Sequence, residues 1–207
     1  DTLIGGSGSD VIDGGYDHDV AVFAGVQGDY TFASSADGLT VTVTQRYTGD
    51  VDTVTNVETL SFDDGDIAVS HDGMGLVLMG QSADNIEVVG PVGVTVLGEA
   101  GDDHLMGGDG NDTIDGGFGS DFIAGGDGAD AIMGGVGGDT IDGGSGIDYI
   151  MGGAGGDTID GGLGSDFIDG GDGNDTIGGG DGSDSILGGL GSDTIDGGSD
   201  RKSTRLN

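Results

Sequence analysis

The stretch GGDGNDTIDGGFGSDFIAGG, residues 107–126, places two glycines, a third glycine, an aspartate and one aliphatic residue at fixed positions every nine residues. Eleven such nonapeptides follow one another from Gly98 to Asp196, and only the first lacks the second glycine, where Glu99 stands. Self-similarity at a short fixed period is typical of a solenoid, in which each unit is stable only when it is stacked on its neighbours. This repeat therefore decides the fold.

Two positions of the nonapeptide never vary in kind. Position eight is aliphatic, with Leu105 in the first unit and isoleucine in the other ten. Two further units, GGSGSDVID and the degraded GGYDHDVAV, open the chain and place Asp10 and Asp19 at position six. Position six of the long array is aspartate throughout: Asp103, Asp112, Asp121, Asp130, Asp139, Asp148, Asp157, Asp166, Asp175, Asp184 and Asp193.

The glycines fall where a tight turn needs backbone angles that a side chain would forbid. The residues around position eight form a three-residue strand whose middle side chain points inward. One unit cannot bury that side chain alone. Two units per coil let repeats n and n+2 stack about 4.8 Å apart and join their aliphatic side chains into one thin core. We therefore predict an all-β fold, a parallel β-roll with a small β-rich module inserted between its repeats.

The same stacking would align the position-six carboxylates in two ladders, where like charges repel strongly. A hard divalent cation held by one aspartate and by backbone carbonyls of two adjacent turns would remove that repulsion. Calcium fits an irregular, carbonyl-rich oxygen cage better than magnesium, which demands a small octahedron. We therefore predict multiple Ca²⁺ ions bound by the position-six aspartates, Asp10 and Asp19 included.

The predicted carbonyl donors lie in the turns between strands. Aspartates at position nine, such as Asp142, are expected only to face solvent. The turn residues whose backbone carbonyls we predict to bind calcium are Gly107, Asp109, Gly116, Gly125, Gly134, Gly143, Gly152, Gly161, Gly170, Gly179 and Gly188.

Residues 23–97 lack the period and are rich in threonine, valine and aromatic residues instead. The alternation in residues 39–44, with Leu39 on the same face as the two valines, follows an Asp37-Gly38 turn and predicts a half-buried hairpin. A second hairpin is predicted over residues 60–69, and the valines of residues 92–96 predict a strand that leads into the long array.

The chain divides by composition into the end of an upstream array (1–22), a β-rich module (23–70), an irregular β transition (71–97), the long roll (98–199) and a tail (200–207). Because the opening DTLIGG begins inside a repeat, the chain is expected to be a fragment. The closing DRKSTRLN carries three of the four basic residues and resembles the translation of a sequencing-adapter read. We interpret it as a non-native tail, and a genuine basic tail is the alternative.

The formal net charge of −35, from 39 acidic and 4 basic residues, favours cations as partners and argues against nucleic acid, phosphate or an anionic membrane surface. The chain contains no cysteine, so disulfides and thiolate metal sites are excluded. No apolar run is long enough for a membrane span, and no catalytic motif surrounds the isolated histidines. We predict no membrane span and no enzyme activity in this stretch, while the activity of a longer parent protein stays open.

The units GGDGNDTID, GGAGGDTID and GGLGSDFID resemble the repeats-in-toxin (RTX) nonapeptide, the hemolysin-type calcium-binding repeat. The resemblance covers residues 98–199 and, with one weak unit, residues 1–22, as in the C-terminal region of serralysin-like proteins. Residues 23–69 more loosely resemble the β-rich module that often interrupts such arrays. The resemblance implies a secreted, extracellular protein exported through type I secretion machinery.

The resemblance does not name the activity of the parent protein, because proteases, lipases, cytolysins and adhesins share such arrays. Our interpretation is a calcium-binding module that folds outside the cell and supports the export of a larger protein. Two alternatives stay open. One is a repetitive adhesin or matrix protein in which the array is the working part, and the other is the C-terminal part of a secreted protease or lipase.

Overall fold

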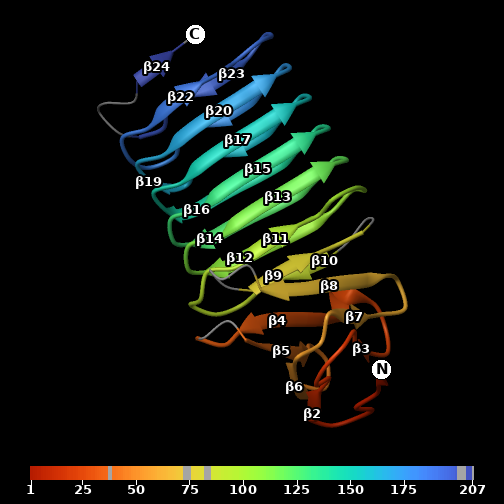
Figure 1. Ribbon diagram of the computed structural model, residues 1–207. Helices are drawn as coiled ribbons and strands as arrows, with labels where there is room; N and C mark the ends of the chain where they lie inside the picture. The colour runs from red at the N-terminus through yellow and green to blue at the C-terminus, as the bar shows by residue number, and fades with distance from the viewer. Residues whose placement is uncertain (37–38, 72–75, 82–84, 200–203, 207) are drawn as a thin grey trace.

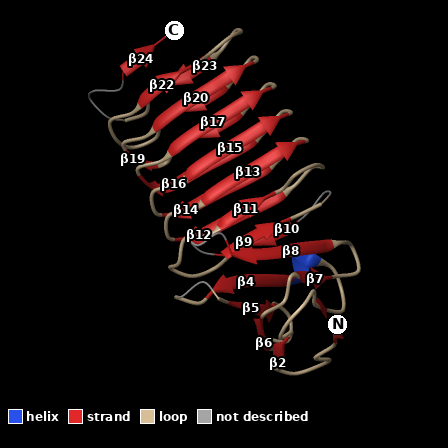
Figure 2. Cartoon of the chain, in the orientation of Figure 1, coloured by secondary structure: helices blue, strands red, loops and turns tan. Residues whose placement is uncertain are grey.

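The computed structural model describes residues 1–36, 39–71, 76–81, 85–199 and 204–206. Stacked strands make up nearly all of the regular structure, and they rise in steps from the N-terminal module towards the C-terminus (Figure 1). Within these residues, the one helical element is a short 3-10 turn, η1 (Gln27–Asp29), drawn in blue in Figure 2. None of the described segments forms a helix with the length and apolarity of a membrane span. The predicted all-β class is confirmed.

Three sheets account for the strands. The largest has the order β1 (Thr2–Leu3), β3 (Val20–Val22), β7 (Thr59–Ser61), β8 (Asp66–His71), β9 (Leu76–Met79), β11 (Thr95–Leu97), β13 (Thr113–Phe118), β15 (Ala131–Val136), β17 (Tyr149–Ala154), β20 (Phe167–Asp172), β22 (Ser185–Leu187) and β24 (Thr204–Leu206). The second contains β10 (Asn85–Glu87), β12 (His104–Asp109), β14 (Phe122–Asp127), β16 (Thr140–Gly146), β18 (Thr158–Asp160), β21 (Thr176–Gly178) and β23 (Thr194–Asp196), with β19 (Leu163–Gly164) beside β16. The third has the order β2 (Val11–Asp13), β6 (Val51–Thr55), β5 (Thr40–Gln45) and β4 (Tyr30–Ser34).

The long array forms a parallel β-roll with two nonapeptides per coil. Ile132 lies opposite Ile114 in the first sheet, and Ile141 lies opposite Ile123 in the second, so paired residues are two repeats apart. The position-eight side chains from Leu105 to Ile186 are at most 2% exposed and form a core one residue thick. The predicted stacking of repeats n and n+2 is confirmed.

Glycine is required in the turns for a steric reason as well as a conformational one. Gly155, at position four, has a φ of 149°, in the region that side chains disfavour. A Cβ at this residue would lie only 1.5 Å from the carbonyl oxygen of Gly137 in the preceding coil. Adjacent coils therefore approach each other more closely at this position than any side chain allows.

The β-rich module contains the two predicted hairpins. Strands β4 and β5 pair antiparallel, and so do β7 and β8, with Leu60 opposite Ile67. The predicted Asp37-Gly38 turn lies outside the described residues. Leu39 differs from the expectation, because β5 begins only at Thr40 and the Leu39 side chain is 59% exposed.

The module is continuous with the roll. Strand β8 pairs antiparallel with both β7 and β9, and β9 then pairs in parallel with β11. Leu78 of β9 lies opposite Val96 of β11, and Val96 lies opposite Ile114, so the stacked core extends upstream of the first nonapeptide. The predicted strand in residues 92–96 is present as β11, although it begins only at Thr95. The segment boundaries and the non-native tail stay predictions.

Two isoleucines of one repeat provide a test of the thin core. Ile150 is fully buried, whereas Ile147 in the preceding turn is 68% exposed. We expect Ile150→Ala to lower the free energy of unfolding by about 2–5 kcal/mol, because it leaves a cavity in a core with no second layer. Ile147→Ala should change it by less than about 0.5 kcal/mol. Urea denaturation in saturating calcium measures both, and equal effects would contradict the proposed core.

Candidate metal centre

The position-six aspartates are buried inside the turns rather than solvated. From Asp103 to Asp184 their exposure is between 1 and 3%, and only Asp193 at the end of the array is half-buried. These carboxylates are therefore not ordinary solvated surface charge. Burying an ionised carboxylate costs free energy unless both of its oxygens have hydrogen-bond or ionic partners. The surroundings of Oδ1 and Oδ2 therefore decide whether the burial is tolerated.

The first carboxylate oxygen builds the ladder. The Asp130 backbone N–H donates to Asp148 Oδ1 at 2.9 Å, and the Asp148 N–H donates to Asp166 Oδ1 at 2.9 Å. The same bond recurs along both ladders from Asp112 to Asp193, with donor–acceptor distances of 2.8–3.2 Å. Each carboxylate is thereby oriented by the backbone of the coil before it.

The second carboxylate oxygen has no such partner. Among the described residues, Oδ2 is buried and accepts no hydrogen bond in every ladder aspartate from Asp112 to Asp184, and the same holds for Asp10 and Asp19. A backbone carbonyl of the next coil lies close to this oxygen. Both oxygens lie beside Gly107. A Cβ atom built on this glycine would be 2.4 Å from Asp112 Oδ2 and 2.7 Å from the Gly125 carbonyl oxygen. Two acceptors therefore converge where no donor is available.

Among the described residues of the long array this convergence occurs nine times, always at a position-one glycine. It joins the carboxylate of one repeat to the position-one carbonyl two repeats later, as Asp148 and Gly161 show at Gly143. The carbonyls that converge in this way belong to Gly116, Gly125, Gly134, Gly143, Gly152, Gly161, Gly170, Gly179 and Gly188. At none of the described glycines are the carbonyl oxygens of Gly107 or Asp109 among the three nearest atoms, and their role as donors stays a prediction.

The chemistry of the donors is restricted to oxygen. Within the part of the chain that the structure describes, no three His, Cys, Asp or Glu side chains gather in one place. A bound cation would therefore take one or two carboxylates and complete its shell with backbone carbonyls. That donor set suits calcium, which accepts six to eight oxygen ligands in irregular cages, and it does not suit zinc.

Comparison with known proteins agrees with this geometry. The family model of the RTX calcium-binding nonapeptide repeat (4 copies) matches residues 1–23, 95–123, 106–141, 133–168, 142–177 and 169–201, which together span more than half of the chain. The chain belongs to the RTX calcium-binding nonapeptide repeat family. The matches include both the upstream units and the long array, whereas most of the inserted module lies outside them.

No curated protein matches the RTX chain significantly. Among solved structures, it is similar to the extracellular lipase LipA from Serratia marcescens, with 18% sequence identity and a TM-score of 0.27. That match covers 76% of this chain and 27% of the lipase. The chain thus spans about a quarter of the length of that protein.

Burial sets the protonation chemistry of the RTX ladder. It raises the pKa of Asp112 to about 7 and that of Asp148 to about 6, against the smaller lowering effect of the backbone N–H that each accepts. Neighbouring ladder carboxylates raise the pKa further: Asp130 acts on both of these groups, and Asp184 acts on Asp166, whose pKa is also about 6. At Asp112, Asp148 and Asp166 the carboxyl group therefore favours either a proton or a bound cation.

Sequence reasoning missed a second set of polar contacts around the turns. At position five, Asn111 Oδ1 accepts the Ala129 N–H at 2.8 Å, and Asn174 Oδ1 accepts the Ser192 N–H at 2.8 Å. At position nine, Asp160 is exposed as predicted, but its Oδ1 also accepts the Gly162 N–H at 3.2 Å. The recurrence of Asn, Ser and Asp at position five was the available signal, because short polar side chains cap turns.

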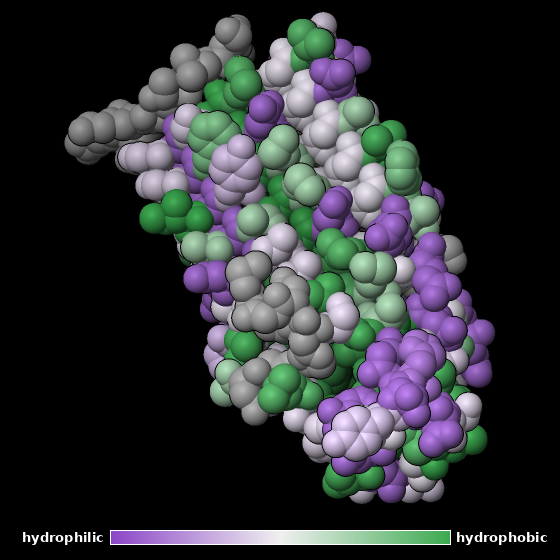
Figure 3. Space-filling model, in the orientation of Figure 1, coloured by the Kyte–Doolittle hydropathy of each residue, from purple (hydrophilic) through white to green (hydrophobic). Residues whose placement is uncertain are grey.

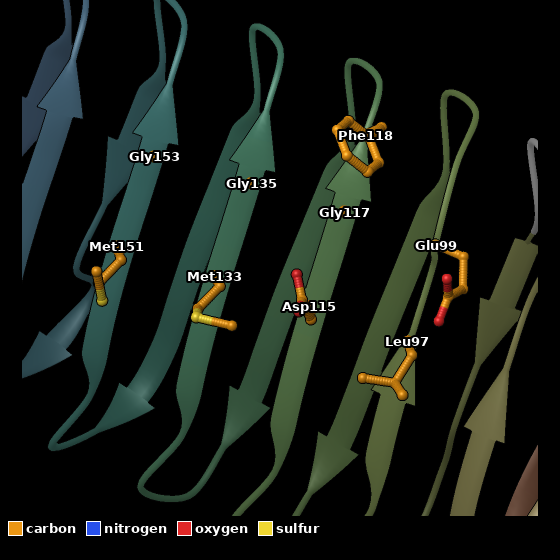
Figure 4. A pocket seen from close by; sticks show the side chains of 9 residues that line it. All are labelled: Leu97, Glu99, Asp115, Gly117, Phe118, Met133, Gly135, Met151 and Gly153. Carbon is orange, nitrogen blue, oxygen red and sulfur yellow. The ribbon is translucent and has the colours of Figure 1, made fainter.

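The outer face of the largest sheet carries an apolar groove that is separate from the ladders. It measures about 430 Å³, and Figure 4 shows Leu97, Met133 and Met151 along one side of it, with Asp115 between them. Phe118 lies on the other side, and no position-six aspartate lines the groove. Apolar residues are also visible among polar ones on the face that Figure 3 presents.

The raised pKa values predict opposite pH responses with and without calcium. A group whose pKa is higher in the folded state stabilises that state at low pH and loses this effect as pH rises through the folded value. In chelator, we expect more β-structure at about pH 5 than at about pH 8, because the stabilisation is lost between the ordinary aspartate value of 3.8 and the folded values of about 6 to 7. In calcium the trend should reverse, because the ion needs ionised carboxylates.

Circular dichroism across this pH range, at fixed calcium or in chelator, measures the effect. Equal β-structure at about pH 5 and about pH 8 in chelator would contradict raised pKa values for the ladder carboxylates.

Proposed function

We propose that this chain is the calcium-binding β-roll of a secreted RTX protein, which folds on binding extracellular calcium and supports the type I secretion and stability of a larger protein. The observation that carries the proposal is the recurring convergence of a buried, unpartnered Asp Oδ2 with a carbonyl of the next coil. The two oxygens of such a pair repel each other unless a proton or a cation lies between them, and at neutral to alkaline pH a cation is needed.

Calcium at these positions would join three coils through one aspartate. Asp148 Oδ1 accepts the N–H of Asp130 in the coil before, while its Oδ2 lies beside the Gly161 carbonyl of the coil after. The aspartate side chain and the position-one carbonyl are the donors that we assign to each ion. When bound, calcium supplies the positive charge that the buried ladder requires.

The charge of the chain explains why folding should depend on the ion. With a net charge of −35 and a core one residue thick, carboxylate repulsion opposes the roll when no cation is present. Binding that selects the folded state stabilises it by RT ln(1 + [L]/Kd) per site, so several stacked sites make the transition steep. Extracellular modules of this kind bind calcium at about 10⁻⁴ to 10⁻³ M, far above the free concentration inside a cell.

Secretion follows from the same coupling. Inside the cell the array would stay unfolded and able to pass a narrow channel. Outside the cell, coils that fold on calcium could not slide back, so folding would pull the remaining chain outward. On this proposal the array serves folding and export rather than catalysis.

A titration with point variants tests the calcium sites. Residues 98–199 should gain β-structure cooperatively at about 10⁻⁴ to 10⁻³ M calcium, and magnesium should substitute poorly. Asp148→Ala should raise the calcium midpoint by about tenfold, a change of roughly 1.4 kcal/mol. Asp103→Ala should have a smaller effect, because it lies in the ragged first repeat.

The control for this titration is Asp142→Ala, since Asp142 is an exposed aspartate in the neighbouring repeat. It removes the same charge and should leave the midpoint nearly unchanged. Circular dichroism measures all three variants. Identical spectra in chelator and in calcium, or equal midpoints for Asp148→Ala and Asp142→Ala, would sink the proposal.

A secretion assay tests the export role separately. The full-length protein that carries this chain is expressed with its type I exporter while calcium is varied only outside the cells. We expect faster and more complete export with calcium, and we expect Asp148→Ala to reduce this gain more than Asp142→Ala. Export that is equally fast with and without calcium would limit the ion to a role in stability.

A further inference from the structure

Part of the inserted module occupies the place of a repeat coil. Strand β6 pairs in parallel with β2 of the upstream array, with Val54 opposite Ile12, and β7 pairs in parallel with β3, with Leu60 opposite Ala21. Residues 51–61 therefore form the coil that follows the two upstream nonapeptides. The paired positions are 39 and 42 residues apart instead of the 18 of the long array, so no nonapeptide pattern marks this coil.

Two acidic residues of this coil stand where ladder aspartates would stand. The Asp19 N–H donates to Glu58 Oε2 at 2.8 Å, and the Asp10 N–H donates to Asp52 Oδ1 at 2.8 Å. These bonds match the ladder bond of the long array, in which each position-six N–H donates to the carboxylate of the next coil. Glu58 and Asp52 thus extend the two upstream ladders by one step.

The backbone contacts of a regular coil are reproduced as well. The Gly14 N–H donates to the Thr55 carbonyl at 3.0 Å, as the Gly161 N–H donates to the Gly178 carbonyl at 2.9 Å in the array. The Thr59 N–H donates to the Asp19 carbonyl at 3.2 Å, which corresponds to the bond between neighbouring array coils at positions seven and six. The module coil is therefore seated on the upstream array in the register of a repeat.

The Asp19 carboxylate meets a carbonyl of the module in the same way that array aspartates meet theirs. A Cβ on Gly14 would lie 1.9 Å from the Asn56 carbonyl oxygen and 2.8 Å from Asp19 Oδ2. Asp19 is fully buried; its Oδ1 pairs with the N-terminal ammonium of Asp1 at 2.8 Å, and within the described residues its Oδ2 has no hydrogen-bond partner. At Gly5, by contrast, the three atoms nearest the Cβ position all belong to Asp10.

The turn that presents this carbonyl is held in place. Asn56 has a φ of 52°, in the left-handed region that asparagine tolerates better than most residues. Its side-chain amide donates to Asp13 Oδ1 of the upstream array at 2.8 Å. A turn of only two residues, Asn56 and Val57, thereby brings a carbonyl to the place that a five-residue glycine turn serves in the array.

We propose that the Asp19 carboxylate and the Asn56 carbonyl bind a calcium ion at the junction between the upstream array and the inserted module, with Glu58 positioning the Asp19 backbone. This inference rests on the proposed calcium-binding function. It completes the site of the last upstream repeat with a donor from outside the repeat motif and gives the module a role: calcium ties the module to the array as one more coil of the roll.

Native mass spectrometry of the whole chain counts the bound ions. Asp19→Asn keeps the size of the side chain and removes its charge, so it should carry one calcium ion fewer than the wild type. The matched control is Asp17→Asn, which removes the same charge two residues away at an exposed position. Equal ion counts for Asp19→Asn and Asp17→Asn would overturn the proposal.

Hydrogen exchange locates the effect. In the wild type and in Asp17→Asn, calcium should slow amide exchange in residues 51–61, and this calcium effect should be lost in Asp19→Asn. Exchange in residues 113–187 should slow with calcium in all three proteins, which shows that the long roll is folded. Calcium protection of residues 113–187 without any protection of residues 51–61 in the wild type overturns only the junction site. Absence of protection in both segments overturns the proposed function itself.

Discussion

The roll depends on burying a row of carboxylates directly beside a row of aliphatic side chains. Position eight supplies a core only one residue thick, and position six places aspartates at 1–3% exposure next to it. Burial of an ionised carboxylate with one unpartnered oxygen is more costly than so thin a core can readily offset. The stability of the fold therefore depends on the binding of a cation. The unpartnered Oδ2 of each ladder aspartate marks where that cation would bind.

The sequence was sufficient to predict most of the roll, because the repeat constrains several levels at once. A nine-residue period with one aliphatic position requires two strands per coil, which sets the parallel register of Ile114 with Ile132. The same register places the aspartates in two ladders. The paired glycines predicted the turns, although the closeness of the coils, as at Gly155 and Gly137, follows only from the coordinates.

The sequence could not predict that the two oxygens of each aspartate carboxylate contact different coils. Oδ1 accepts a backbone N–H from the coil before, 18 residues away, whereas Oδ2 meets a carbonyl of the coil after, as Asp148 meets Gly161. Both contacts depend on the path of the turn. Leu39 shows a related limit. The alternation places Leu39 on the buried face with Val41 and Val43. Because β5 begins only at Thr40, Leu39 lies outside the strand and is exposed.

The module coil escaped detection for a geometric reason. The next coil must supply three features: a carboxylate that accepts one backbone N–H, a carbonyl beside one Oδ2, and a strand in parallel register. None of these features requires glycine at a fixed spacing. Glu58, Asn56 and β7 supply all three with a two-residue turn in the left-handed conformation. A roll of this kind is therefore defined by the contacts between consecutive coils, and a motif search finds only those coils whose turns happen to be built from glycine.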